Sequence, residues 1–263
     1  MTKIGGKTDV HISANSEELA RFAAEQFVRL AIEAQRERGL FTVALAGGST
    51  PKTLYVLLAS EQEPYRAQLD FGMIHFFWGD ERHVPPDHPD SNYRMASEAM
   101  LSKVPIPLEN VHRIKSEMAD AEEAARDYEQ VLENFFRLEN RQLPRFDLVL
   151  LGMGSDGHTA SIFPDSDVIN EKRRLVVAPW IEKLKSYRIT LTPSVLNKAA
   201  STIILVSGAE KAKILYKVLE GEYRPACFPV QLISPSEGGL VWLADREAAQ
   251  LLKKTSAAND PAH

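Results

Sequence analysis

A histidine in a glycine-rich loop is the clearest candidate for chemistry in this chain. Residues 146–151 form a short apolar run, which predicts a buried strand, and a loop with three glycines follows over residues 152–157. Glycine accepts positive φ and lets a ligand approach the backbone closely. In open α/β sheets, ligands bind at the carboxyl ends of the strands. His158 and Asp156 are therefore candidates for acid–base chemistry at such an edge.

The same loop matches the dinucleotide-binding fingerprint, Gly152-x-Gly154-x-x-Gly157. That fingerprint requires a long helix to open directly after the glycines. Here residues 159–163 give barely one turn before Pro164. The context argues against a nucleotide cofactor.

A second glycine-rich turn, residues 47–51 with the sequence GGSTP, follows an apolar run over residues 41–46. Proline suits the first turn of a helix, and we expect that helix to continue to about Ala59. Backbone N–H groups and the helix dipole would make its start an anion site, and Ser49 and Thr50 add hydroxyl donors. A tight turn with a Ser/Thr cap is the alternative. The consensus GxxxxGK[ST] is absent, which argues against nucleoside triphosphate hydrolysis.

Charged residues follow another apolar run, residues 74–78. Residues 79–83 come next and contain Asp80, Glu81 and Arg82, which we expect in a loop at the carboxyl edge of the sheet. Such charges directly after a buried strand favour a site, and a solvated loop is the alternative.

Two further clusters of polar residues are candidate ligand sites. Lys183, Lys185 and Arg188 form a cationic cluster that an anion can use, with ordinary surface charge as the alternative. The second cluster contains His83, Asp87, His88 and Asp90. These residues fit no standard metal-ligand spacing, so we expect no metal there.

The composition is that of an ordinary globular protein. The chain has 263 residues, 44% of them hydrophobic and 25% charged, and the net charge is -5. This charge argues against nucleic-acid binding. The single cysteine, Cys227, fits a reducing compartment, and it reads as a small core residue. Because we find no apolar run of about 18 residues and no secretory signal, we expect a cytoplasmic protein without a membrane partner.

Strands and helices alternate along the chain, which predicts an α/β fold with a mostly parallel sheet. We expect one domain over residues 10–254 and a disordered tail over residues 255–263. The expected strands cover residues 41–46, 74–78, 146–151, 175–178, 187–191, 202–206, 230–233 and 240–243. The expected helices run from a cap at Asn15 to Gly39, and over residues 51–59, 91–101, 120–136, 209–219 and 245–252.

Several sequence blocks, in this order, resemble the 6-phosphogluconolactonase family. They are LAGGSTP (45–51), WGDERHVPPDHPDSNYR (78–94), GMGSDGHTASIFP (152–164) and YRITLTPSVLNKA (187–199), and VSGAEKAKIL (206–215) and GGLVWLAD (238–245) also fit. The similarity runs from about residue 10 to residue 252. The resemblance implies a Rossmann-like open sheet with helices on both faces, as in glucosamine-6-phosphate deaminases and ribose-5-phosphate isomerases.

The resemblance also implies an activity and a set of site residues. The activity is hydrolysis of 6-phospho-D-glucono-1,5-lactone to 6-phosphogluconate in the oxidative pentose phosphate pathway, without a cofactor. The substrate, a sugar-phosphate lactone, is then the expected partner, and the protein is a monomer or a small homo-oligomer. A lysine upstream of Arg188 is expected near the phosphate; Lys183 and Lys185 both qualify, and we assign Lys185. The other residues implied are Gly47, Gly48, Ser49, Thr50, Asp80, Arg82, Gly157, His158 and Arg188.

The chemistry of lactone hydrolysis fits these residues. A neutral histidine, with an ordinary pKa of about 6.5, takes a proton from water as it attacks C1. Asp80 or Asp156 would fix the tautomer of His158, and N–H groups of the loops would stabilise the oxyanion. Arg82 and Arg188 would hold the phosphate and so place C1 against the base.

Two alternatives remain at this point. The first is a sugar-phosphate deaminase or isomerase, although deaminases usually carry a glutamate shortly after the DGH motif, where this chain has Ser161, Ile162 and Phe163. The second is a sugar-phosphate sensor domain of a regulator. Such regulators carry a helix-turn-helix segment, for which the roughly 14 residues before the first expected helix are too few.

Overall fold

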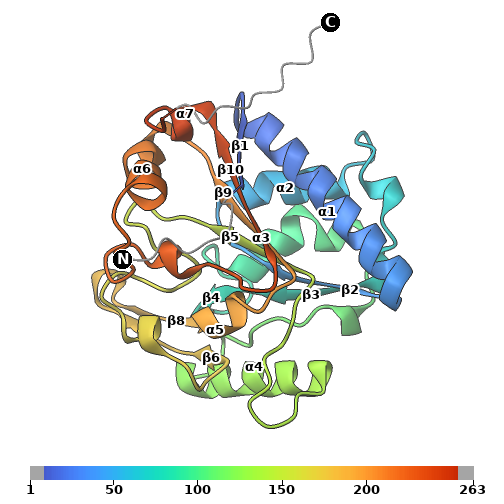
Figure 1. Ribbon diagram of the computed structural model, residues 1–263. Coiled ribbons are helices and arrows are strands. Elements are labelled where there is room, and N and C mark those ends of the chain that lie inside the picture. Colours follow the sequence, from blue (N-terminus) through green and yellow to red (C-terminus); the bar gives the residue numbers. More distant parts are fainter. Residues whose placement is uncertain (1–8, 254–263) are drawn as a thin grey trace, which may run out of the picture.

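A parallel sheet of six strands forms the centre of the molecule (Figure 1). The computed structural model describes residues 9–253, so the predicted disordered tail lies outside the described residues. The strand order is β1-β10-β9-β5-β2-β3, and every neighbouring pair is parallel. The strands are β1 (Asp9–Ser13), β2 (Phe41–Leu45), β3 (Ile74–Trp78), β5 (Leu148–Gly152), β9 (Ser201–Val206) and β10 (Gly239–Asp245). The prediction of a mostly parallel α/β sheet is confirmed, whereas a single domain over residues 10–254 stays a prediction.

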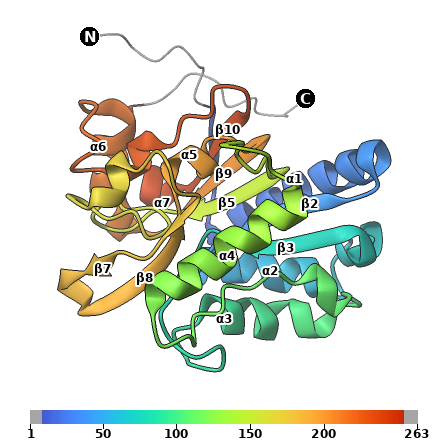
Figure 2. The same cartoon turned by 90° about the horizontal axis from the view of Figure 1, so that it is seen from below.

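Helices flank the sheet on both sides. Helices α1 and α2 pack against each other, and α4 lies on the opposite side of the sheet (Figures 1 and 2). Asn15 caps α1 through its side chain, and Gly39 ends it at φ 77°, both as predicted. Among residues 9–253, no helix combines the length and the apolar character needed to cross a membrane. The helices are α1 (Ser16–Arg38), α2 (Ser49–Ala59), α3 (Asn92–Ala99), α4 (Ala121–Phe136), α5 (Pro193–Leu196), α6 (Ala212–Glu220) and α7 (Arg246–Ala249).

A small antiparallel sheet lies beside the carboxyl end of β3. It consists of β4 (Asp80–Arg82), β8 (Ser186–Leu191) and β6 (Val176–Val177), and β7 (Trp180–Ile181) pairs with β8. Residues 79–83 were predicted at the carboxyl edge of the sheet, with a solvated loop as the alternative, but a strand over residues 80–82 was not predicted. The cause is long-range pairing: residues 80–82 hydrogen-bond with a strand more than 100 positions later in the chain, which no local pattern encodes.

Other elements also differ from the predictions. Residues 230–233 do not form a strand, because Pro229–Leu232 is a 3-10 helix. A short apolar run cannot distinguish a strand from a buried helical turn. Strands β1 and β7 and helix α5 were missed, and α7 ends at Ala249, three residues before the predicted end.

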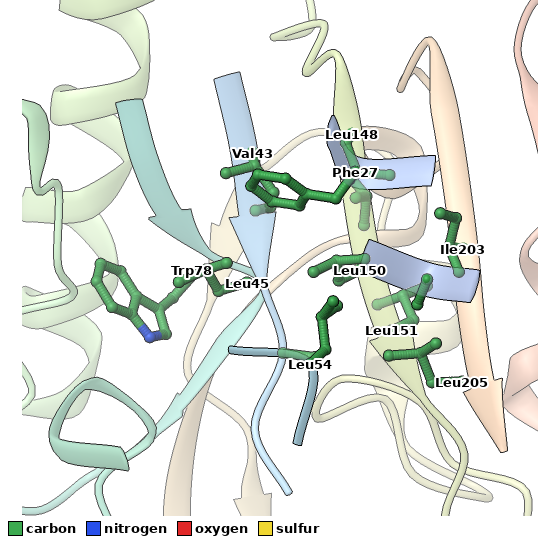
Figure 3. Packing of buried hydrophobic residues seen from close by; sticks show 14 of the residues in the cluster. Phe27, Val43, Leu45, Leu54, Trp78, Leu148, Leu150, Leu151, Ile203 and Leu205 are labelled. Atoms are coloured by element: carbon green, nitrogen blue, oxygen red, sulfur yellow. The ribbon is translucent and has the colours of Figure 1, made fainter. Parts of the chain in front are cut away.

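The core fills the space between the sheet and its helices. Figure 3 shows Phe27 of α1 and Leu54 of α2 close to Leu150 of β5, and all three side chains are fully buried. Their burial is the main stabilising contribution, at about 1.5–3 kcal/mol for each large apolar side chain. The packing fixes the sheet and therefore the positions of its strand ends.

Two buried tyrosines hold the strand ends that lead toward the polar loops. The hydroxyl of Tyr55, on α2, accepts from the N–H of Ala46 at 2.9 Å and donates to its C=O at 2.8 Å. The hydroxyl of Tyr128, on α4, does the same for Trp78, at 2.8 Å and 3.1 Å. Burial raises the pKa of both phenols, so both stay protonated and can donate.

Replacing Tyr128 with phenylalanine should destabilise the protein by about 1–3 kcal/mol. The substitution leaves a buried N–H and a buried C=O at Trp78 without their partner. Urea unfolding at equilibrium measures the change. The control is Tyr216→Phe on α6. Tyr216 is 36% exposed, and this substitution should shift the free energy of unfolding by less than about 0.5 kcal/mol. Equal stability of the two variants would contradict the role given to Tyr128.

Candidate active site

A cleft opens at the carboxyl ends of β2, β3 and β5, where the sequence predicted a site. One cavity of about 240 Å³ is lined by residues that include Gly47, Gly48, Asp80 and His158. A second, of about 220 Å³, shares Asp80 and His158 with it and adds Arg188. Because the two cavities share these side chains, we treat them as one cleft.

His158 is held in a defined orientation by its own loop. Its Nδ1 lies 2.5 Å from Oδ1 of Asp156, and its ring stacks on Phe163 with centroids 4.2 Å apart. An ionised carboxylate only accepts hydrogen bonds, so the proton of a neutral ring lies on Nδ1 and Nε2 carries the free lone pair. A Cβ at Gly154 would lie 2.0 Å from Nδ1 of His158, which explains the glycine at that position.

Asp156 stays ionised beside this histidine. Partial burial acts to raise its pKa, but hydrogen bonds from His158 and Lys183 outweigh burial and hold the pKa well below its ordinary value. The ammonium of Lys183 pairs with Oδ2 of Asp156 and lies 4.6 Å from the centroid of the Phe163 ring. The sequence left Asp80 and Asp156 open as partners of the histidine, and the geometry favours Asp156.

Asp80 occupies another wall of the cleft. It is 8% exposed, and its Oδ2 accepts a hydrogen bond from Oγ of Ser161 at 2.6 Å. Its backbone C=O accepts from Nδ2 of Asn92 at 2.9 Å. Asp80 therefore faces the same cavity as His158 but is not hydrogen-bonded to it in this structure.

Arg82 and Arg188 lie opposite each other on β4 and β8. Both line the second cavity with His158, and among the described residues neither forms an ion pair with a carboxylate. Arg82 donates to the C=O of Asp90 at 2.5 Å. Burial, and then the charge of Arg82, lower the pKa of Arg188. Two close cations without an acidic partner make this wall suitable for an anion.

The lysine assigned from the sequence lies apart from the cleft, and a neighbouring lysine lines it. The side chain of Lys185 is 72% exposed and pairs with Glu182, whereas Lys183 lines the second cavity. The physical reason is the turn between β7 and β8, where Lys185 takes the left-handed conformation at φ 48°. The structure therefore favours Lys183 as the lysine near a bound anion.

A third lysine, Lys211, lines the first cavity and was missed by the sequence reasoning. It follows the turn at Ser207 and Gly208, which Asp245 holds by accepting from the Ser207 hydroxyl at 2.5 Å and from the Gly208 N–H. The sequence does carry a signal for Lys211. In the block VSGAEK, a glycine turn precedes a short helix, and Lys211 lies within the first turn of that helix.

The glycine loops play different parts. Gly47 and Gly48 line the cleft, and Ser49 and Thr50 begin α2 directly after them. Gly157 has φ 81°, and its N–H and C=O are bonded to Gly154 and Val230. Gly157 therefore shapes the loop, since its backbone groups are already used within the fold.

The structure gives little support to a nucleotide or a metal. Residues 158–166, directly after the third glycine, form turns and no helix, and the next helical segment is the short 3-10 helix Asp167–Asn170, so the long helix that the dinucleotide fingerprint needs does not follow the glycines. Within residues 9–253, no group of three or more His, Cys, Asp or Glu side chains is arranged to hold a metal ion.

Comparison with known proteins gives consistent matches. The family model described as glucosamine-6-phosphate isomerases/6-phosphogluconolactonase matches residues 14–242. A 6-phosphogluconolactonase of Synechocystis is 43% identical over 217 residues, which are 82% of this chain and 87% of that protein. The structure of 6-phosphogluconolactonase from Trypanosoma brucei superposes with a TM-score of 0.81 at 32% identity, and covers 94% of this chain and 99% of that one.

A more distant match has another activity. A monomeric glucosamine-6-phosphate deaminase superposes with a TM-score of 0.78 at 21% identity, covering 93% of this chain and 100% of that one, which shows a shared fold and nothing more. The match of the family model over most of the chain, together with the identity to the Synechocystis protein, decides the family. The chain belongs to the glucosamine-6-phosphate isomerase/6-phosphogluconolactonase family.

Proposed function

We propose that this protein is a 6-phosphogluconolactonase, which hydrolyses 6-phospho-D-glucono-1,5-lactone to 6-phospho-D-gluconate in the oxidative pentose phosphate pathway. The observation that carries the proposal is His158, oriented by its hydrogen bond with Asp156, in one cleft with two arginines that have no acidic partner among the described residues. The similar proteins of Synechocystis and Trypanosoma brucei, both named 6-phosphogluconolactonase, support it.

His158 acts as the general base in this mechanism. Its Nε2 takes a proton from water while the water oxygen forms a bond to C1 of the lactone. The bond between C1 and the ring oxygen then breaks, and the ring oxygen receives the proton and becomes the C5 hydroxyl. Asp156 holds Nδ1 and stabilises the positive charge that the ring carries between these steps.

The remaining groups of the cleft bind and orient the substrate. In the second cavity, Arg82, Arg188 and Lys183 supply positive charge for the phosphate. In the first cavity, Lys211 adds a further positive charge near the start of α2. Asp80 has one carboxylate oxygen bonded to Ser161 and offers its remaining lone pairs to substrate hydroxyls. Fixing both ends of the sugar holds C1 against His158.

Replacing Arg188 or Arg82 with alanine should weaken substrate binding by roughly 1.5–3 kcal/mol each, the range for hydrogen bonds to charged groups. Calorimetric titration with 6-phosphogluconate measures the loss, and gluconate, which lacks the phosphate, should lose little. The control is Arg246→Ala on the exposed side of α7. If both variants bind 6-phosphogluconate like the unmodified protein, the phosphate site lies elsewhere.

Deamination of an amino sugar phosphate is the alternative within the same family. It requires ring opening and proton transfer between C1 and C2, for which the related enzymes use a further carboxylate after the histidine. Residues 159–163 contain none, and Ser161 in that stretch is instead bonded to Asp80. These residues favour the hydrolase.

Two parallel assays test the proposed function. We expect the protein to consume 6-phosphogluconolactone, coupled to 6-phosphogluconate dehydrogenase and corrected for spontaneous opening of the lactone. We expect no ammonia release from glucosamine 6-phosphate. Ammonia release without lactonase activity would overturn the proposal. Binding of sugar phosphate with neither activity would favour a sensor.

The cellular setting follows from composition and substrate. We place the protein in the cytoplasm, because its single cysteine suits a reducing compartment and the substrate is a soluble sugar phosphate. The net charge of -5 makes a nucleic-acid partner unsuitable. We propose that the protein acts as a monomer or a small homo-oligomer.

A further inference from the structure

A buried carboxylate that the proposed reaction does not use fixes the start of α3. Glu81, on β4, is 1% exposed. Its Oε1 accepts from the N–H groups of Arg82 and Asn92 at 2.8 Å and 2.7 Å. Its Oε2 accepts from the N–H of Tyr93 at 2.8 Å and from the hydroxyl of Ser91 at 3.1 Å. These four donors use the hydrogen-bonding capacity of the carboxylate, so the start of α3 is tied to β4.

Asn92, the first residue of α3, extends from this anchor into the cleft. It is 2% exposed. Its Nδ2 donates to the backbone C=O of Asp80 at 2.9 Å and lies 3.4 Å from Oδ1 of the same residue. Both neighbours are acceptors, so the amide NH₂ must face Asp80 and its oxygen must point the other way.

The amide oxygen of Asn92 packs against the loop that opens α2. A Cβ built on Gly47 would lie 1.9 Å from Oδ1 and 2.4 Å from Cγ of Asn92. Gly47 is not among the glycines with positive φ, so its backbone conformation alone does not require glycine. The position needs glycine because Asn92 occupies the space. One amide therefore touches both Asp80 and the glycine loop.

We propose that Asn92 is a positioning residue that sets the spacing of these two walls of the cleft, with Glu81 as the anchor of its backbone. The inference rests on the proposed function, since Asp80 and Gly47 line the same cavity as His158. Displacement of a substrate-binding group by about 1 Å can reduce turnover on the order of 10²-fold. Asn92 itself does not need to touch the reacting atoms.

The first test compares two buried asparagines. Asn110 is 5% exposed, and its Nδ2 donates to the C=O of Gly72 at 2.9 Å, but it does not line the cleft. Asn92→Ala and Asn110→Ala each remove a buried hydrogen bond from a side-chain amide to a backbone C=O and should lower the melting temperature. Only Asn92→Ala should lower kcat/KM, by roughly 10- to 100-fold, below the melting temperature of both. If the Asn92 variant keeps kcat/KM within about twofold, the positioning role is overturned.

The second test is a double-mutant cycle between the two walls. Gly47→Ala should lower the melting temperature strongly in the unmodified protein and much less in the Asn92→Ala background, because the clash is then gone. Additive effects would overturn the contact. This cycle does not depend on the reaction. If the unmodified protein shows no lactonase activity, the proposed function fails. The melting temperatures of the cycle and the affinity of Asn92→Ala for 6-phosphogluconate then still test the role of Asn92.

Discussion

Replacing His158 with alanine should lower kcat by roughly 10²- to 10⁴-fold, the usual contribution of a general base. The side chain lines both cavities of the cleft, and its Nδ1 is bonded to Asp156, which leaves Nε2 for the attacking water. The fold should survive, because the ring is partly exposed and its main contacts lie within its own loop. The measurement is the coupled lactonase rate beside a thermal melt, with the spontaneous opening of the lactone subtracted.

A second histidine provides the control for this substitution. His11 lies on β1, which forms one edge of the central sheet, and β3 forms the opposite edge. The ring of His11 stacks on Phe22. His11→Ala should keep the turnover of the unmodified protein even if it lowers the melting temperature. Near-normal turnover in folded His158→Ala would remove this histidine from the mechanism.

Local patterns were sufficient to predict most of the central sheet. Strand β3 begins and ends at the predicted residues, and α1 has the predicted caps, Asn15 and Gly39. These features depend on apolar periodicity and on side chains next to each other in the chain. In the small antiparallel sheet, β6 and β8 overlap predicted strands, but β4 was not predicted, since it acquires its strand geometry only by pairing with β8. Its residues alone read as a charged loop.

The candidate site was predictable in type but not in detail. Sequence blocks identified His158 and the glycine loops, because these residues are adjacent in the chain. Which carboxylate, Asp80 or Asp156, pairs with His158 depends on side chains that meet in space. The same holds for which lysine, Lys183 or Lys185, lies near the cleft. Asn92 illustrates the same limit, since its contact with Gly47 joins residues 45 positions apart. No spacing in the sequence encodes such a contact.

Asp156→Asn should reduce kcat by roughly 10²- to 10⁴-fold, the range for loss of a base or of its correct tautomer. The carboxylate serves two side chains at once: one oxygen accepts from the ring and the backbone N–H of His158, and the other faces the ammonium of Lys183. An asparagine has only one oxygen, so its NH₂ group must face one of these side chains. If the oxygen turns to Lys183, the NH₂ donates to Nδ1 of His158, and the ring proton moves to Nε2, where the base is required.

The tautomer can be measured separately from the rate. Nitrogen NMR of the His158 ring should show the proton on Nδ1 in the unmodified protein and on Nε2 in Asp156→Asn. Because the pKa of Asp156 is well below its ordinary value, its carboxylate stays ionised above about pH 4. The contribution of this carboxylate to stability is therefore present at neutral pH and is lost only as the pH falls through that low pKa. Loss of activity between neutral pH and about pH 5 should thus not come from Asp156. A proton still on Nδ1 would mean that the asparagine oxygen faces His158 in place of the carboxylate, whereas near-normal kcat with the proton on Nε2 would show that Asp156 does not orient the base.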